Sequence, residues 1–66
     1  MQIVLNGELR VLTPGVSVAG LLKELGIDLR KVAVERNLEI VPKSTFETTQ
    51  LADGDRIEIV HFIGGG

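Results

Sequence analysis

Apolar and polar residues alternate over residues 1–6, which is typical of a β-strand with one buried face. Asn6-Gly7 follows, and Leu9 and Val11 continue the alternation beyond it. Two alternating runs joined by Asn-Gly predict a β-hairpin, because a type I′ turn needs a positive φ at both central residues. We expect Leu9 and Val11 to face the core of the protein.

An amphipathic helix is predicted over residues 17–25, with Ser17 as its N-cap. Gly20 lies inside this pattern, and the expected reason is a close approach between the helix and the sheet. Gly26 stands where a residue with positive φ would end the helix. So short a helix is not stable alone and has to pack on another element. Its apolar stripe consists of Val18, Leu21, Leu22 and Leu25.

The second half of the chain contains three further strand patterns. Residues 32–36 form a short β-branched run, residues 39–41 form a briefer one that ends before Pro42, and residues 56–62 alternate again. Residues 43–51 have weak periodicity, which is compatible with a loop or with one helical turn.

This order of elements predicts an α+β fold, with a mixed four- to five-stranded sheet and one main helix packed on one face. The helix connects two strands, so we expect the last strand to lie beside the first, parallel to it and central in the sheet. The core is expected between the strands and the apolar stripe of the helix. The strands would contribute Ile3, Leu5, Leu9, Val11, Val32, Val34, Ile57 and Ile59.

The chain has 66 residues, nine acidic and seven basic side chains, and a formal net charge of -2. This length allows one domain with one small core. The sequence shows neither a basic stripe nor a long apolar run, so binding to nucleic acid and insertion into a membrane are both disfavoured. We expect a cytoplasmic protein that is a monomer when alone, with a domain over residues 1–63 and a flexible glycine tail over residues 64–66.

Candidate catalytic groups are few. The sequence has no cysteine and one histidine, His61, for which the sequence identifies no partner. Asp53 and Asp55 flank Gly54, but a calcium loop needs more oxygen ligands at fixed spacings, so Asp-Gly-Asp is interpreted as a turn. The sequence therefore predicts no catalytic residue, no metal site and no tightly bound cofactor.

Gly64, Gly65 and Gly66 follow the last strand pattern almost directly. No helix pattern comes after them, so they do not form a phosphate-binding loop. Glycines at a chain end are often no more than mobile main chain. They also make a thin chain that fits a narrow enzyme channel, and the last carboxylate is an unhindered group that ATP can activate as an acyl adenylate. The second interpretation is favoured, because the sequence offers no other reactive group.

The chain resembles the ThiS family of sulfur carriers in thiamine biosynthesis, which has the ubiquitin-like β-grasp fold. The resemblance covers the whole chain. It rests on residues 1–7, 32–37 (Val-Ala-Val-Glu-Arg-Asn), 39–42 (Glu-Ile-Val-Pro) and 51–55, and on the glycine tail. Gly64 is the one departure from the minimal Gly-Gly pattern.

This resemblance implies a carrier that partner enzymes act on. An E1-like adenylyltransferase (ThiF-like) would consume ATP to adenylate the carboxylate of Gly66. Sulfur from a cysteine desulfurase-derived persulfide would convert the adenylate into a thiocarboxylate, and a thiazole synthase (ThiG-like) would accept that sulfur. Gly64 and Gly65 would lie in the channels of these partners.

A docking surface is expected next to the tail. Val60 and Phe62 alternate with the core residues of the last strand, so both are expected to be partly exposed beside Val4. Phe62 is one of two aromatic residues in the chain and is the candidate anchor for a partner.

Three alternatives share the predicted fold. The chain could carry sulfur for another pathway, as the small subunit of molybdopterin synthase does. It could be a ubiquitin-like modifier that is conjugated through Gly66. It could also be a β-grasp binding module, such as a TGS-like RNA-binding domain, although the acidic charge balance disfavours RNA.

Overall fold

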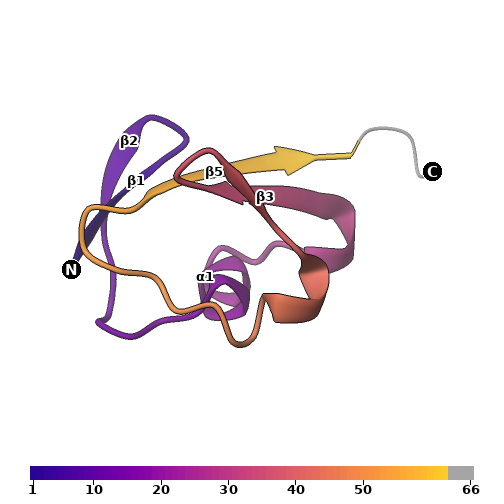
Figure 1. The fold of residues 1–66 in the computed structure, drawn as a ribbon, viewed down its shortest axis with the longest axis horizontal. Helices are drawn as coiled ribbons and strands as arrows, with labels where there is room; N and C mark the ends of the chain where they lie inside the picture. The colour runs from indigo at the N-terminus through magenta and orange to yellow at the C-terminus, as the bar shows by residue number, and fades with distance from the viewer. Residues whose placement is uncertain (63–66) are drawn as a thin grey trace.

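A computed structural model describes residues 1–62 of the 66-residue chain. Five strands form one mixed sheet in the order β2-β1-β5-β3-β4. The helix α1 (Val18–Glu24) covers one face of this sheet (Figure 1). This is the α+β arrangement of the β-grasp fold, as predicted. The strands are β1 (Gln2–Leu5), β2 (Glu8–Val11), β3 (Val32–Arg36), β4 (Glu39–Val41) and β5 (Arg56–His61).

The last strand, β5, lies in the centre of the sheet. It pairs in parallel with β1 on one side and antiparallel with β3 on the other, which confirms the predicted closure of the sheet. Its final residue, His61, lies opposite Val32, the first residue of β3. The chain therefore leaves the sheet from its central strand, at the end where β3 begins (Figure 1).

The predicted hairpin joins β1 and β2. Asn6 and Gly7 have φ values of 47° and 83°, as the type I′ turn requires. The expectation that Leu9 and Val11 face the core is wrong, because their side chains are 73% and 76% exposed. A two-residue turn sets Leu5 opposite Glu8 and Val4 opposite Leu9, and cross-strand partners share a face. Leu9 and Val11 therefore lie on the face away from α1.

Charged residues of β2 take the side of the strand that faces α1. Glu8 and Arg10 lie opposite the buried residues Leu5 and Ile3, yet both are exposed because β2 is the edge strand. Inward-pointing charges on an edge strand disfavour its pairing with a strand of another molecule.

The helix begins and ends as the sequence predicts. The Ser17 hydroxyl accepts a hydrogen bond from the Gly20 N–H at 3.0 Å, which is an N-cap contact. At the other end Gly26 has φ 70°, and the N–H groups of Gly26 and Ile27 donate to the carbonyls of Lys23 and Leu22. These two bonds form a Schellman motif, which requires positive φ at Gly26.

Gly20 has a different role from the predicted one. A Cβ atom at this position would lie 2.9 Å from Cγ2 of Val16 and 3.4 Å from Oγ of Ser17. The close neighbours are therefore the residues just before the helix, and the sheet is not among them. The missing side chain lets the chain turn tightly into α1.

The weakly patterned residues 43–51 hold the start of the helix. They contain a 3₁₀ turn, η2 (Lys43–Thr45), followed by the buried side chain of Phe46. The carbonyls of Thr49 and Phe46 accept hydrogen bonds from the N–H groups of Val18 and Ala19 at 2.9 and 2.8 Å. These contacts satisfy donors that the first turn of a helix cannot pair by itself.

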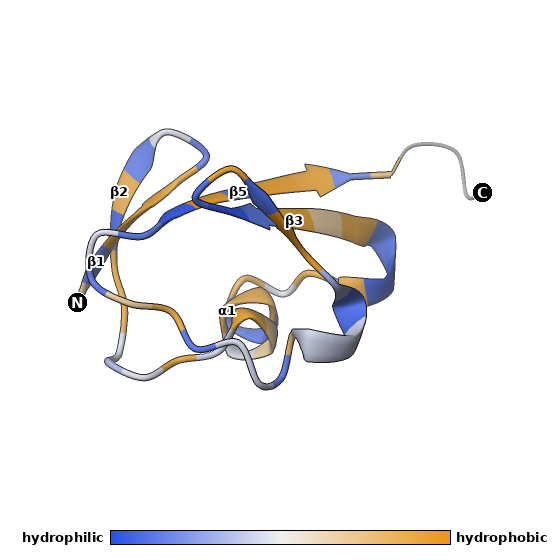
Figure 2. Ribbon diagram, viewed as in Figure 1, coloured by the Kyte–Doolittle hydropathy of each residue, from blue (hydrophilic) through white to orange (hydrophobic). Residues whose placement is uncertain are grey.

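The core lies between the sheet and α1, and Figure 2 shows hydrophobic residues on β5, β3 and α1, which enclose it. Leu25, predicted as a core residue, is only partly buried. A second 3₁₀ turn, η1 (Leu29–Lys31), leads into β3. Among residues 1–62, no helix is long and apolar enough to cross a membrane. The buried apolar residues are Ile3, Leu5, Leu12, Val18, Leu21, Leu22, Val32, Val34, Val41, Phe46, Leu51, Ile57 and Ile59.

Candidate functional site

The face of the sheet away from α1, here called the outer face, carries several exposed apolar side chains. Neighbouring residues of a strand point to opposite faces, and residues paired across two strands point to the same face. Each of these apolar residues either follows or precedes a buried residue in its own strand, or is paired with a residue of the next strand that does so. The sequence predicted exposure for Val60, which is 58% exposed. It did not predict that three further residues join this face: Leu9, Val11 and Ile40.

Val4 belongs to the outer face but does not lie beside Val60. It is half-buried, lies opposite Leu9 of β2 and is the register partner of Arg56 of β5. Val60 is four positions further along β5, opposite Ala33 of β3. Because a strand rises about 3.3 Å per residue, Val4 and Val60 lie in different parts of the face. The prediction that Val60 and Phe62 lie beside Val4 is therefore wrong.

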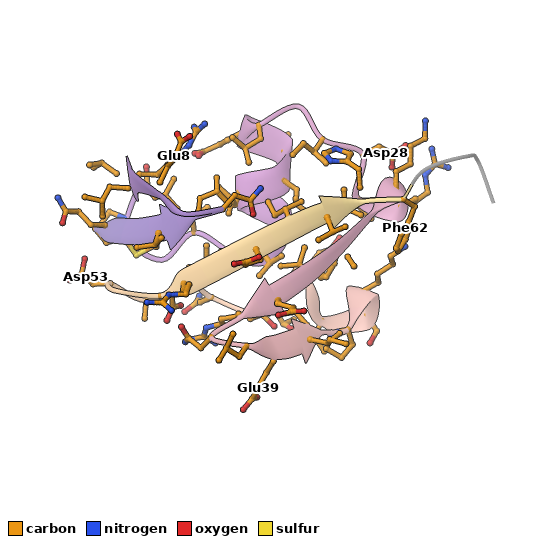
Figure 3. All side chains as sticks on the ribbon, turned by 90° about the horizontal axis from the view of Figure 1, so that it is seen from above. Glu8, Asp28, Glu39, Asp53 and Phe62 are labelled. Carbon is orange, nitrogen blue, oxygen red and sulfur yellow. The ribbon has the colours of Figure 1, made fainter. Side chains whose placement is uncertain are left out.

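Phe62 directly follows β5 and is 55% exposed, as the sequence predicts. Its N–H donates to the carbonyl of Lys31 at 2.8 Å, so the main chain is still held to the sheet at this residue. The ammonium group of Lys43 lies 5.0 Å from the centre of the Phe62 ring and also donates to the carbonyl of Arg30 at 3.0 Å. The cation–π contact orients the ring at the end of β5 (Figure 3).

The sequence pattern does not reveal the role of Lys43. This residue belongs to the weakly patterned segment, and its long side chain reaches both the Phe62 ring and the carbonyl of Arg30, just before β3. The three glycines expected to act in the tail, Gly64, Gly65 and Gly66, lie outside the described residues. The predicted domain boundary at residue 63 does so as well.

At the other end of β5, the carboxylate of Asp55 joins the turns of the sheet. Asp55 is buried and accepts hydrogen bonds from Nε of Arg36 at 2.8 Å, Nδ2 of Asn37 at 3.1 Å and the N–H of Ala52 at 2.8 Å. Burial by itself raises the pKa of Asp55. The hydrogen bonds from Ala52, Asn37 and Arg36 and the charge of Arg36 outweigh burial and hold the pKa below its usual value. Asp55 is a structural anion, and the predicted turn at residues 53–55 is confirmed.

The Asp55 cluster fixes an unusual turn between β3 and β4. Asn37 and Leu38 have φ values of 53° and 71°, the left-handed region that disfavours leucine. The Asn37 N–H donates to the carbonyl of Arg56 at 2.8 Å, and the Arg56 N–H donates to Oδ1 of Asn37 at 2.9 Å. Leu38 itself is 80% exposed.

Groups suited to catalysis are not gathered in the described part of the chain. Among residues 1–62 there is no cluster of three or more His, Asp or Glu side chains that could hold a metal ion. His61 is exposed near the end of β5. What the described residues do provide is an apolar outer face and an anchored aromatic ring at the point where the chain leaves the sheet.

Known proteins resemble this chain over most or all of its length. A thiazole synthase of Paramagnetospirillum magneticum is 59% identical over all 66 residues of this chain, which spans only 20% of that relative's length. Sulfur carrier protein ThiS of Bacillus subtilis is 44% identical over 50 residues, which are 76% of each protein.

The crystal structure of the thiamine biosynthesis protein ThiS from Geobacter metallireducens matches this fold with a TM-score of 0.87 and 32% identity, over the full length of both chains. The model of the ThiS family matches residues 3–66. The chain therefore belongs to the ThiS family.

Proposed function

We propose that this protein is a sulfur carrier of thiamine biosynthesis, on which partner enzymes act. The observation that carries the proposal is the position of three consecutive glycines in the sequence: only Ile63 separates them from Phe62, where the chain leaves the central strand of a ThiS-family fold. Glycines have no side chains to block entry into a narrow active site. A carrier needs such a segment, together with a folded body that partners recognise.

The chemistry is proposed for the carboxylate of Gly66. An E1-like enzyme transfers AMP from ATP to this carboxylate and releases pyrophosphate. A persulfide, formed by a cysteine desulfurase, then attacks the carbonyl carbon and displaces AMP, which leaves an acyl disulfide. A thiol cleaves the disulfide bond and is itself oxidised, so that Gly66 keeps one sulfur atom as a thiocarboxylate.

A thiazole synthase is the proposed acceptor of this sulfur. Support comes from the Paramagnetospirillum magneticum relative, a thiazole synthase in which a segment like this chain is part of the same polypeptide. Two units joined in one polypeptide are held at a high effective concentration, as suits successive steps of one pathway. Gly64 and Gly65 are proposed to occupy the channel that leads to the synthase active site.

Intact-mass analysis of the protein isolated from its own host tests the proposal. The expected result is a fraction of molecules that end at Gly66 with one oxygen replaced by sulfur. A variant that lacks Gly65 and Gly66 is the matched control and should contain no such fraction. Isopeptide adducts on lysines of other proteins would indicate a modifier, and molecules that always continue beyond Gly66 would contradict the proposed chemistry.

Transfer to the acceptor is tested with purified proteins. Thiocarboxylated carrier is incubated with thiazole synthase and the other substrates of that enzyme, and the loss of the sulfur from the carrier is followed by mass. We expect loss only in the presence of active synthase. Loss of the sulfur when the carrier takes the place of the small subunit of molybdopterin synthase, and not with thiazole synthase, would assign the carrier to a different pathway.

A further inference from the structure

The main-chain groups of β5 face its two neighbours in alternation. The carbonyl of Arg56 and the N–H of Phe62 bond to Asn37 and Lys31, on the side of β3. The N–H and carbonyl groups of the odd-numbered residues of β5 point toward β1. There, the carbonyl of Ile57 accepts a hydrogen bond from the N–H of Asn6 at 2.9 Å. Along β5, the next residues that face β1 are Ile59 and His61.

The side chain of Asn6 ends the pairing on this side. Its Oδ1 accepts from the N–H of Ile59 at 2.8 Å, and its Nδ2 donates to the carbonyl of Ile59 at 3.3 Å. One amide therefore takes the place of a further β1 residue. The turn at Asn6 and Gly7 then leads the chain away into β2, so that the hairpin stops short of the end of β5 (Figures 1 and 3).

His61 lies beyond this last pair. Its N–H and carbonyl point to the side that β1 has left, and in the part of the chain that the structure describes neither group has a hydrogen-bond partner. The residue is exposed. The central strand thus becomes an edge strand over its final residue, directly before Phe62 and the glycines.

The surroundings of this edge are suited to an extended peptide. Val60 and Phe62 flank His61 in the sequence and are both more than half exposed. A strand placed beside β5 would find an N–H and a carbonyl at His61 and apolar contacts at its two neighbours. The devices that usually protect an edge, such as proline or an inward-pointing lysine, do not occur at residues 60–62.

We propose that an extended segment of the thiazole synthase pairs with β5 at His61, in line with β1, and so continues the sheet across the interface. This inference rests on the proposed function, because the synthase is the partner that receives the tail. Main-chain pairing next to Phe62 fixes the direction in which the following residues enter the synthase. Asn6 marks the point where the carrier's own pairing stops and the partner's begins.

Amide hydrogen exchange, followed by NMR on the full chain, tests the pairing. In the free carrier, the His61 N–H should exchange faster than that of Ile59, which is bonded to Asn6, and that of Phe62, which is bonded to Lys31. Saturating thiazole synthase should slow exchange at His61 by about tenfold or more. A complex that forms without added protection at His61 would overturn the proposal, as would protection in the free carrier that grows with its own concentration.

Two variants separate the main chain of His61 from its side chain. His61→Pro removes the N–H without breaking a bond to β3, whereas His61→Ala removes the imidazole and keeps the N–H. We expect His61→Pro to weaken binding of the synthase by about tenfold, and His61→Ala to change it by less than twofold. Urea unfolding of both variants checks that the fold is retained, and equal affinities of two folded variants would contradict the proposal.

Sulfur loading separates a failure of the strand pairing at His61 from a failure of the proposed sulfur-carrier function. If the wild-type carrier acquires a thiocarboxylate and transfers it to the synthase while His61 stays unprotected, the proposed function stands and the strand pairing is wrong. If no sulfur is acquired and no complex forms, the proposed function itself fails.

Discussion

Asn6 bonds through one side-chain amide to both main-chain groups of Ile59, 53 residues away in the sequence. Its own N–H bonds to Ile57, so three hydrogen bonds tie the first hairpin to the central strand at this residue. Asn6 also occupies a turn position with φ 47°. The same residue therefore closes the β1–β2 hairpin and ends the β1–β5 pairing.

Replacement of Asn6 should reveal both roles. Asn6→Gly keeps a residue that tolerates positive φ but removes the amide, and we expect it to lower the free energy of unfolding by about 1–2 kcal/mol. Asn6→Ala loses the amide and also strains the turn, so it should be the less stable of the two variants. Urea unfolding measures both values. Stability equal to wild type in Asn6→Gly would mean that water replaces the amide without loss.

Asp55 should make the fold sensitive to acid. Because its pKa is lower in the folded state than in the unfolded state, its contribution is full above the unfolded value of about 4 and is lost as the pH falls toward the folded pKa. Asp55→Asn is expected to cost roughly 1.5–3 kcal/mol at pH 7 and to unfold with a shallower pH dependence below pH ~4. Urea unfolding across this pH range measures both effects.

Asp28 provides the control for this experiment. A hydrogen bond from the Arg30 side chain lowers the pKa of Asp28 to about 2, but the pair lies on the surface. Added salt should therefore screen the contribution of Asp28 and leave most of that of Asp55. If high salt removes the whole pH dependence of the wild type, the buried cluster is not its source.

Leu38 stands at a turn position that favours glycine. With φ 71° and an exposed side chain, it has strain without compensating burial. Leu38→Gly creates the Asn-Gly sequence of a type I′ turn and should raise the free energy of unfolding by about 0.5–1 kcal/mol. Leu38→Ala retains positive φ at a residue with a Cβ atom and should leave stability nearly unchanged. A lower stability of Leu38→Gly would show that the leucine side chain makes a stabilising contact.

Phe62 is predicted to anchor a partner enzyme at the exit of the chain from the sheet. Its ring is more than half exposed, so Phe62→Asp should leave the fold intact while it weakens binding of the activating enzyme by about tenfold or more. Leu38→Asp is a matched control, because Leu38 is an exposed apolar residue at the opposite end of β5. Calorimetry measures both affinities, and unchanged binding of Phe62→Asp would rule out the anchor.

The strand and helix order could be predicted because each element has a local signal. Asn6-Gly7, the apolar stripe of α1 and Gly26 each determine the conformation of a few neighbouring residues, and all three predictions are confirmed. The orientation of β2 was predicted wrongly. Alternation shows that Leu9 and Val11 share a face, but only the register imposed by the two-residue turn decides which face it is.

The candidate site could be predicted only in part for a similar reason. Exposure of Val60 and Phe62 follows from alternation within one strand, which the sequence contains. The neighbours of these residues depend on how strands are offset along the sheet, so the distance of Val4 from Val60 could not be predicted. The contact of Lys43 with Phe62 joins a segment without periodicity to the end of β5, and such contacts leave no local pattern.

The parallel pairing of β1 with β5 has a mechanical consequence. The chain enters the sheet at the start of β1 and leaves it at the end of β5, so a pull between Met1 and Phe62 draws the two strands in opposite directions along their length. Such a pull shears the hydrogen bonds between the strands and loads them together, so that no single bond yields first. The force that a folded protein withstands is set by the free-energy barrier to its unfolding. A partner that held the carrier at β1 and drew the residues after Phe62 into a channel would load this pair of strands in shear.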